Sequence, residues 1–304
     1  MQTILQSLGS FSCTYYTYVH STTVSVKPTA QTFPRLFVTN FEGHEQDLFE
    51  VPIYNDPRYN RLVPAFPDPE ESDVRCEGDV RRVYAHIGLL VERAFSNAPK
   101  VWHNWETGPP GPDVHTAETV DAFYGVHIGG RAAPQHCATI GELKRPGVIN
   151  KDQWLQQDPR SDTVRLGKQM RMYAYQYKCP QAFCFDGKYL LVIRFRADSR
   201  ADIRDANCEA DVFFVDNSAS NIPYWIDRLI AEGLNRLRAA FARALALGGY
   251  QRHFRYFDGR PYWMDQQNNV FWDHPGGYKR SFSNEQWWWD HDDYASVVDT
   301  PKLE

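Results

Sequence analysis

Residues 138–147 read ATIGELKRPG, an apolar run that is followed by charged residues and a Pro-Gly pair. On a β-strand, residues i and i+2 point to the same face, so Glu142 and Lys144 would project together while Leu143 points into a core. The Pro-Gly pair then marks the end of the strand. The stretch therefore predicts a strand that presents an acid beside a base. From the stretch alone, two alternatives stay open: a solvent-exposed ion pair and a catalytic site.

Patterns on both sides of this strand predict alternating helices and strands. Apolar residues recur every three to four positions where a helix with one buried face is expected, and short apolar runs bounded by Gly, Pro or Asp mark strands. The expected elements, in order, are a helix at 79–97, strands at 119–128 and 137–143, a helix at 163–179, a hairpin at 182–197 that turns at Asp186-Gly187, a strand at 211–216, and a helix at 221–247 that is stopped by Gly248-Gly249. The predicted fold class is therefore α/β (α+β), a mixed sheet flanked by helices.

Length and composition indicate how the chain is organised. Its 304 residues are 42% hydrophobic and 14% aromatic, which is enough for a substantial core. We expect a core domain at 71–250, preceded at 1–70 by short strands and irregular cover, and followed at 251–304 by an aromatic, irregular appendage. The net charge of −5 excludes recruitment of nucleic acid by bulk charge, so any such binding needs a local basic patch.

The cysteines and the N-terminal stretch predict a location. The first residues lack the basic and apolar regions of a signal peptide, and no run of about 18 apolar residues predicts a membrane span. The six cysteines are scattered and form no C-x-x-C pair. This pattern favours an intracellular protein, cytoplasmic or nuclear, with reduced thiols.

The order of the expected elements resembles the core of the PD-(D/E)xK nuclease-like superfamily, which runs α-β-β-β-α-β. The resemblance spans residues 77–196, well under half of the chain. The residues that carry it are Glu77 at the start of the first helix, Asp121 in the strand TVDAFYGV, Glu142 and Lys144 in GELK, and Gln169 and Tyr173, which match the Q-x-x-x-Y of the RecB-like branch. The resemblance implies a restriction-endonuclease-like core.

The resemblance also implies a chemistry. Asp121 and Glu142 would bind Mg²⁺ or Mn²⁺, hard cations that take carboxylate oxygens. The metal would acidify a bound water, and Lys144 would orient the resulting hydroxide or neutralise a phosphate oxygen. Gln169 would hydrogen-bond the water or a phosphate. The expected catalytic residues are thus Asp121, Glu142, Lys144 and Gln169.

The strand aspartate has a second candidate. The literal Pro-Asp pair of the family name occurs at Pro112-Asp113, in an expected loop, whereas Asp121 lies inside an expected strand. We prefer Asp121, because a metal ligand should be held by the sheet, and the choice stays open.

Contacts to nucleic acid are expected from Tyr173, Arg194 and Arg236. Arginines gain affinity for a phosphate backbone through counterion release. The alternative for the two arginines is an ordinary solvated face, and for Tyr173 it is a position in the core.

Three functions are consistent with these observations. The first is a Mg²⁺-dependent nuclease or related phosphodiesterase acting on DNA or RNA. The second is a nuclease fold repurposed, without a metal cofactor, to hold a tRNA for aminoacyl transfer or peptide-bond formation, as in fungal cyclodipeptide synthases that use arginyl-tRNA. The third is a non-catalytic nucleic-acid-binding module.

Overall fold

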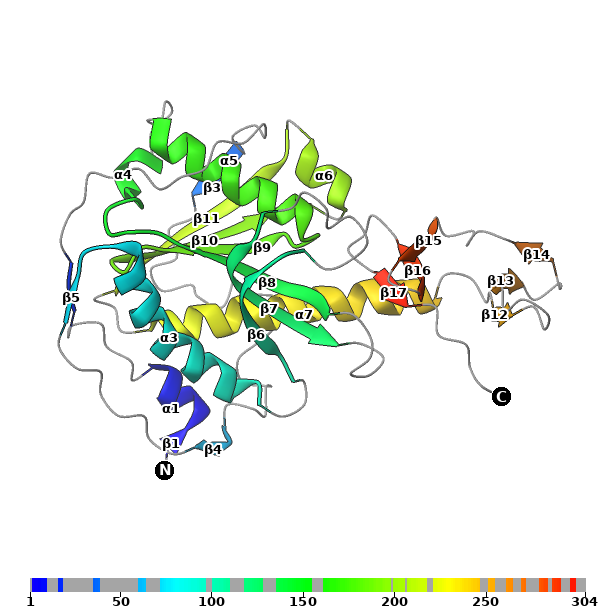
Figure 1. Ribbon diagram of the computed structural model, residues 1–304, viewed down its shortest axis with the longest axis horizontal. Coiled ribbons are helices and arrows are strands. Elements are labelled where there is room, and N and C mark those ends of the chain that lie inside the picture. The colour runs from blue at the N-terminus through cyan, green and yellow to red at the C-terminus, as the bar shows by residue number, and fades with distance from the viewer. Residues whose placement is uncertain are drawn as a thin grey trace.

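A seven-stranded mixed sheet lies at the centre of the described part of the chain, with the strand order β3-β11-β10-β9-β8-β7-β6 (Figure 1). The computed structural model describes residues 2–9, 16–18, 35–38, 60–63, 72–96, 100–109, 118–127, 135–154, 161–197, 199–205, 207–217, 221–246, 251–254, 261–264, 269–271, 279–283, 286–290 and 296–298. The strands of the main sheet are β3 (Arg35–Val38), β6 (Trp102–Thr107), β7 (Val120–His127), β8 (Gln135–Leu143), β9 (Gln181–Phe185), β10 (Tyr189–Phe195) and β11 (Glu209–Asp216).

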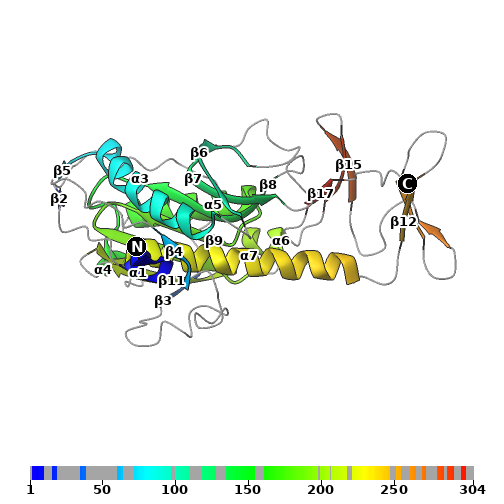
Figure 2. The ribbon, with the colours of Figure 1, turned by 90° about the horizontal axis from the view of Figure 1, so that it is seen from below.

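Helices cover both faces of this sheet (Figures 1 and 2). The described helices are α1 (Ile4–Gly9), α3 (Glu77–Ala94), α4 (Lys151–Trp154), α5 (Ser161–Gln176), α6 (Arg200–Arg204) and α7 (Ile222–Ala246). Helices α1, α3 and α7 share one hydrophobic cluster with the sheet, and α5 and α6 share a second cluster on the opposite face. The prediction of a mixed sheet flanked by helices is therefore confirmed.

Strand β6 is a strand of the main sheet that the sequence patterns did not predict. Its residues WHNWET are polar or aromatic, and none of them is fully buried. Within the part of the chain that the structure describes, it forms the edge of the sheet and pairs antiparallel with β7 alone. An edge strand with two partly exposed faces shows no clean alternation of apolar and polar residues, which is why it escaped prediction.

The predicted hairpin exists as β9 and β10, but its turn is shifted by one residue. The amide of Asp186 donates to the carbonyl of Tyr189 at 3.2 Å, so the two central residues are Gly187 and Lys188. Gly187 has φ of 85°, which a two-residue hairpin turn favours at its first central position. The prediction of Asp186-Gly187 as the turn pair is therefore wrong.

Asp186 connects the end of β8 to this hairpin. Its buried carboxylate accepts hydrogen bonds from four backbone N–H groups, those of Gly147, Ile149, Lys188 and Tyr189, at 2.8 to 3.0 Å. The first two lie in the loop that follows GELK. The turn residue thus holds the loop beside the strand end that carries the charged pair.

Helix α7 approaches β8 closely at Gly233. A Cβ atom at this position would lie 1.9 Å from the carbonyl oxygen of Ala138, so only glycine fits. One turn further, Arg236 donates to the carbonyl of Cys137 at 2.7 Å and to the side chain of Gln181 at 2.8 Å. The long helix is therefore fastened to the strand that carries Glu142.

Smaller sheets accompany the main one. They are formed by β1 (Gln2–Thr3) with β4 (Leu62–Val63), β2 (Tyr16–Tyr18) with β5 (Ser72–Val74), β12 (Gln251–Phe254) with β13 (Pro261–Met264) and β14 (Val270–Phe271), and β15 (Lys279–Ser283) with β16 (Gln286–Asp290) and β17 (Ser296–Val298). Along the axis of α7, strands β12 to β14 lie beyond the end of the helix, whereas β15 to β17 lie level with its last part (Figures 1 and 2). The C-terminal stretch predicted as irregular thus contains six short strands, a correction to the prediction. The expected stop at Gly248-Gly249 lies outside the described residues.

None of the described helices is long and apolar enough to cross a membrane. Five cysteines in the described part of the chain are free thiols, namely Cys76, Cys137, Cys179, Cys184 and Cys208. The intracellular location stays a prediction.

Candidate functional site

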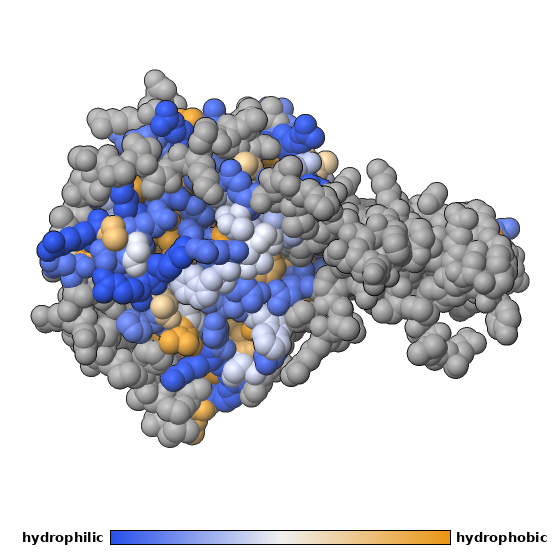
Figure 3. All heavy atoms as spheres, viewed as in Figure 1, coloured by the Kyte–Doolittle hydropathy of each residue, from blue (hydrophilic) through white to orange (hydrophobic). Residues whose placement is uncertain are grey.

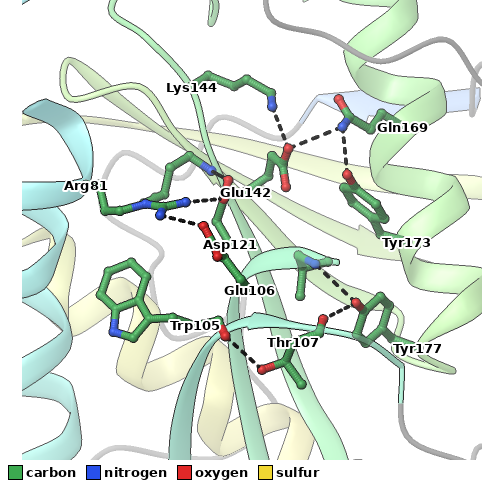
Figure 4. Close-up of polar contacts among 12 residues, drawn as sticks. Arg81, Trp105, Glu106, Thr107, Asp121, Glu142, Lys144, Gln169, Tyr173 and Tyr177 are labelled. Atoms are coloured by element: carbon green, nitrogen blue, oxygen red, sulfur yellow. Dashed lines mark hydrogen bonds and ion pairs between the residues drawn. The ribbon is translucent and has the colours of Figure 1, made fainter. Parts of the chain in front are cut away.

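Asp121 and Glu142 lie side by side on neighbouring strands (Figure 4). Ala122 of β7 pairs with Gly141 of β8, so the antiparallel register places Asp121 beside Glu142 at the next position. The Asp121 carboxylate accepts a hydrogen bond from the backbone N–H of Leu143 at 2.8 Å. The structure thus brings together the strand aspartate and the glutamate of GELK, while Asp113 lies outside the described residues.

Glu142 and Lys144 form a buried ion pair. The ammonium group of Lys144 lies 2.5 Å from Oε1 of Glu142, and the two residues are only 2% and 4% exposed. A solvent-exposed pair, one of the two alternatives left open by the sequence, is therefore excluded. Lys144 follows the last residue of β8, and its backbone N–H donates to the carbonyl of Phe185 at 2.9 Å. The parallel neighbour β9 thus fixes the lysine at the end of the strand.

Helix α5 supplies the third side of the site. The amide nitrogen of Gln169 donates to Oε1 of Glu142 at 3.2 Å and to the hydroxyl of Tyr173 at 2.8 Å. Both residues are fully buried and lie one turn apart on the helix. Asp121, Glu142, Lys144 and Gln169 therefore converge from β7, β8 and α5, with Tyr173 behind the glutamine.

Burial governs the charge of Glu142. Removal from water raises the pKa of its carboxyl to about 7, the charges of Asp121 and Glu77 add to this rise, and the Lys144 ammonium opposes it. Burial alone would lower the pKa of Lys144, but the Glu142 carboxylate outweighs it and the pKa is raised. Near neutral pH the site thus holds a lysine that is charged and a glutamate that can gain or lose a proton.

Arg81 of α3 is a site residue that the sequence analysis missed. Its guanidinium donates to Asp121 at 3.0 Å and to Glu106 of β6 at 2.6 Å. The helix carrying it has a defined start, because the Asp79 carboxylate accepts the N–H groups of Arg75 and Cys76. The sequence places Arg81 one turn after Glu77 on the same expected helix, which could have suggested a place in the site. Its partner Glu106, however, lies on β6, a strand that was not predicted.

The carboxylates fit a Mg²⁺ or Mn²⁺ ion. Oε2 of Glu142 is a buried oxygen with no hydrogen-bond partner, as a metal ligand would be in the ion's absence. Mg²⁺ needs only one or two protein carboxylates, because waters and substrate phosphates complete its coordination. The described residues contain no cluster of three or more potential metal ligands. Asp121 and Glu142 would therefore hold the ion, in competition with Arg81.

The three residues expected to contact nucleic acid form contacts with other residues of the same chain. Tyr173 is buried behind Gln169, Arg194 pairs with Glu232 at 3.0 Å, and Arg236 bonds to strands β8 and β9. A role for them in nucleic-acid binding stays a prediction without support from their positions.

No protein-family model matches the chain. Searches of curated proteins and of solved structures give no significant match either.

Proposed function

We propose that the protein is a PD-(D/E)xK-like enzyme that hydrolyses phosphodiester bonds in a nucleic acid with the help of a divalent metal. The observation that carries the proposal is the convergence of Asp121, Glu142, Lys144 and Gln169 at the ends of two paired strands. Two hard carboxylates beside a buried cation and an amide donor suit the binding of a metal and a phosphate.

The order of elements supports a restriction-endonuclease-like core. From α3 the main elements run α3-β6-β7-β8-α5-β9, with the short α4 before α5. This is the α-β-β-β-α-β order of the superfamily, and β6 is the strand that completes it. The acidic Glu77 is the first residue of α3, as the resemblance implies.

Each residue has a task in this reaction. When bound, the metal supplies charge neutralisation and an acidified water, held by Asp121 and Glu142. Lys144, buried and charged, stabilises negative charge on the phosphate as the bond breaks. Gln169 orients Glu142 and can hydrogen-bond the attacking water. Glu142 acts in its deprotonated form, because a protonated carboxyl is a poor ligand for a cation.

Cleavage assays test this proposal directly. Purified protein is incubated with plasmid, single-stranded DNA and RNA, each with Mg²⁺, with Mn²⁺ and with a chelator. We expect cleavage of at least one substrate that depends on the divalent metal. A complete lack of cleavage under every condition would contradict hydrolysis.

One observation favours a second candidate, tRNA-dependent aminoacyl transfer or peptide-bond formation on the same fold. The Arg81 guanidinium pairs with Asp121, and the Lys144 ammonium pairs with Glu142. A carboxyl with a pKa of about 7 suits a general base at neutral pH. Incubation with charged tRNAs and analysis of the products tests this candidate. Release of only the free amino acid would contradict it.

A further inference from the structure

Glu142, Lys144 and Gln169 are buried, so the accessible side of the site is formed by other residues. The side chains of Arg81, Glu106 and Asp121 are 39%, 60% and 15% exposed. In Figure 3, hydrophilic residues spread over much of the described surface on this side, with residues of intermediate hydropathy among them. Arg81 and Glu106 of β6 thus form an exposed polar surface next to Asp121.

Trp105 lies beside this exposed polar surface. It is among the large hydrophobic residues that remain exposed, at 39%, and it belongs to the edge strand β6. Its ring packs edge-on against Tyr84 at 5.8 Å and lies 4.8 Å from the ring of His103. These buried neighbours hold the indole in one orientation while part of it stays open to solvent.

Arg81 connects this ring to the site. Its guanidinium carbon lies 5.8 Å from the centre of the Trp105 ring, and its nitrogens bond to Glu106 and Asp121. Figure 4 shows the arginine between the tryptophan and the carboxylates. A guanidinium can exchange a carboxylate for a phosphate with the same paired geometry.

The backbone next to Trp105 is strained. Glu106 has φ of 47°, in the left-handed region that non-glycine residues rarely occupy. The hydroxyl of Tyr177, the residue that directly follows α5, donates to the carbonyl of Thr107 and so holds this conformation. Strain of this kind clusters at ligand-binding sites, and here it positions Glu106 against Arg81.

We propose that Arg81 and Trp105 form a nucleotide-binding subsite beside Asp121, in which the guanidinium leaves Glu106 to bind a phosphate and the indole ring stacks on an unpaired base. The inference rests on the proposed function and names its substrate class. A base offers its face for stacking only when it is unpaired, so the preferred substrate is single-stranded nucleic acid or a single-stranded end.

Binding in the presence of a chelator tests the subsite without cleavage. Fluorescence anisotropy is measured with labelled oligothymidine, oligouridine and a blunt DNA duplex. The proteins are the wild type, Trp105→Ala, Trp105→Phe and the control Leu89→Ala. The control also removes an exposed apolar side chain, but from helix α3, where Leu89 is 47% exposed. We expect Trp105→Ala to weaken binding of single strands about tenfold, and Trp105→Phe to keep most of it. Binding of the duplex should not change.

Arg81→Gln separates a phosphate contact from a structural role. Log affinity falls as log salt concentration rises, and we expect the magnitude of this negative slope to be smaller by about one for this variant. An unchanged slope would overturn the phosphate contact. Single-strand affinities of Trp105→Ala and Trp105→Phe equal to that of Leu89→Ala would overturn the stacking contact.

Cleavage assays on the same proteins separate this inference from the proposed function. If the wild type cleaves single strands but Trp105→Ala binds them equally well, the subsite alone fails. If the wild type binds no oligonucleotide and cleaves none, both fail. Trp105-dependent binding without any cleavage would overturn hydrolysis and support the subsite.

Discussion

Glu142 should make the stability of the protein depend on pH. Its folded pKa of about 7 lies above the ordinary value of 4.5, chiefly because the carboxyl is buried. Between these two values the folded state holds more protons than the unfolded state, so the free energy of unfolding falls as pH rises. The loss is complete above about pH 7, where the folded carboxyl is ionised.

The variant Glu142→Gln should remove this dependence. From about pH 5 to about pH 8, we expect the free energy of unfolding of the wild type to fall by about 2 kcal/mol more than that of the variant. Thermal unfolding in the presence of a chelator measures this difference. Burial also raises the pKa of Asp186, to about 6, but both proteins share this effect and the difference between them isolates Glu142. Stability curves that run parallel across this range would show that Glu142 does not titrate there.

Arg236 should contribute to stability. Its guanidinium binds the carbonyl of Cys137 and the side chain of Gln181, which would lose a donor in Arg236→Ala. We expect the free energy of unfolding of this variant, measured in denaturant, to be about 1–3 kcal/mol lower than that of the wild type. Arg165→Ala, which removes a half-exposed arginine of α5, should change stability by less than about 0.5 kcal/mol. Normal stability with weakened oligonucleotide binding for Arg236→Ala would instead favour the sequence prediction of a nucleic-acid contact.

At the scale of elements, the contact between α7 and β8 depends on a glycine. A Cβ at Gly233 would overlap the carbonyl oxygen of Ala138, which belongs to a central strand and cannot move freely. Gly233→Ala should therefore push the helix away from the sheet and destabilise the protein by about 3 kcal/mol or more.

Gly78→Ala is the matched control for this change. Gly78 lies in the first turn of α3, where an added Cβ would meet only the sulfur of Cys76 at 3.7 Å. We expect this variant to be as stable as the wild type or more stable by about 0.5 kcal/mol, since alanine favours the helix. Equal effects of the two substitutions on the denaturation midpoint would contradict the close approach of α7.

Elements with strong periodicity could be predicted from the sequence, and elements at edges could not. Helices α3, α5 and α7 and strands β7 to β11 bury one or both faces, and burial creates the pattern that the sequence shows. Strand β6 and the short strands after α7 lack such a pattern. The exact turn of the β9–β10 hairpin depended on Asp186, whose carboxylate bonds to a distant loop.

The site could be predicted in part for the same reason. Asp121, Glu142 and Gln169 lie on elements whose order and spacing are visible in the sequence, so their convergence could be expected. Arg81 and Trp105 could not be placed, because their positions depend on how α3 packs beside an unpredicted edge strand. Arg236 was expected to contact nucleic acid, with a solvated face as the alternative, but it fastens α7 to the sheet.

At the scale of the whole molecule, the central claim is that paired strands and a helix build a metal-dependent phosphodiesterase site. The most direct test is the rate of nucleic-acid cleavage in Mg²⁺ or Mn²⁺ by the wild type, Asp121→Asn, Glu142→Gln and the control Asp162→Asn, whose side chain is 59% exposed on α5. We predict that the two site variants, with folding verified by circular dichroism, lose about a hundredfold or more of the rate, while the control keeps it. Cleavage by Glu142→Gln at the rate of the wild type would contradict the claim.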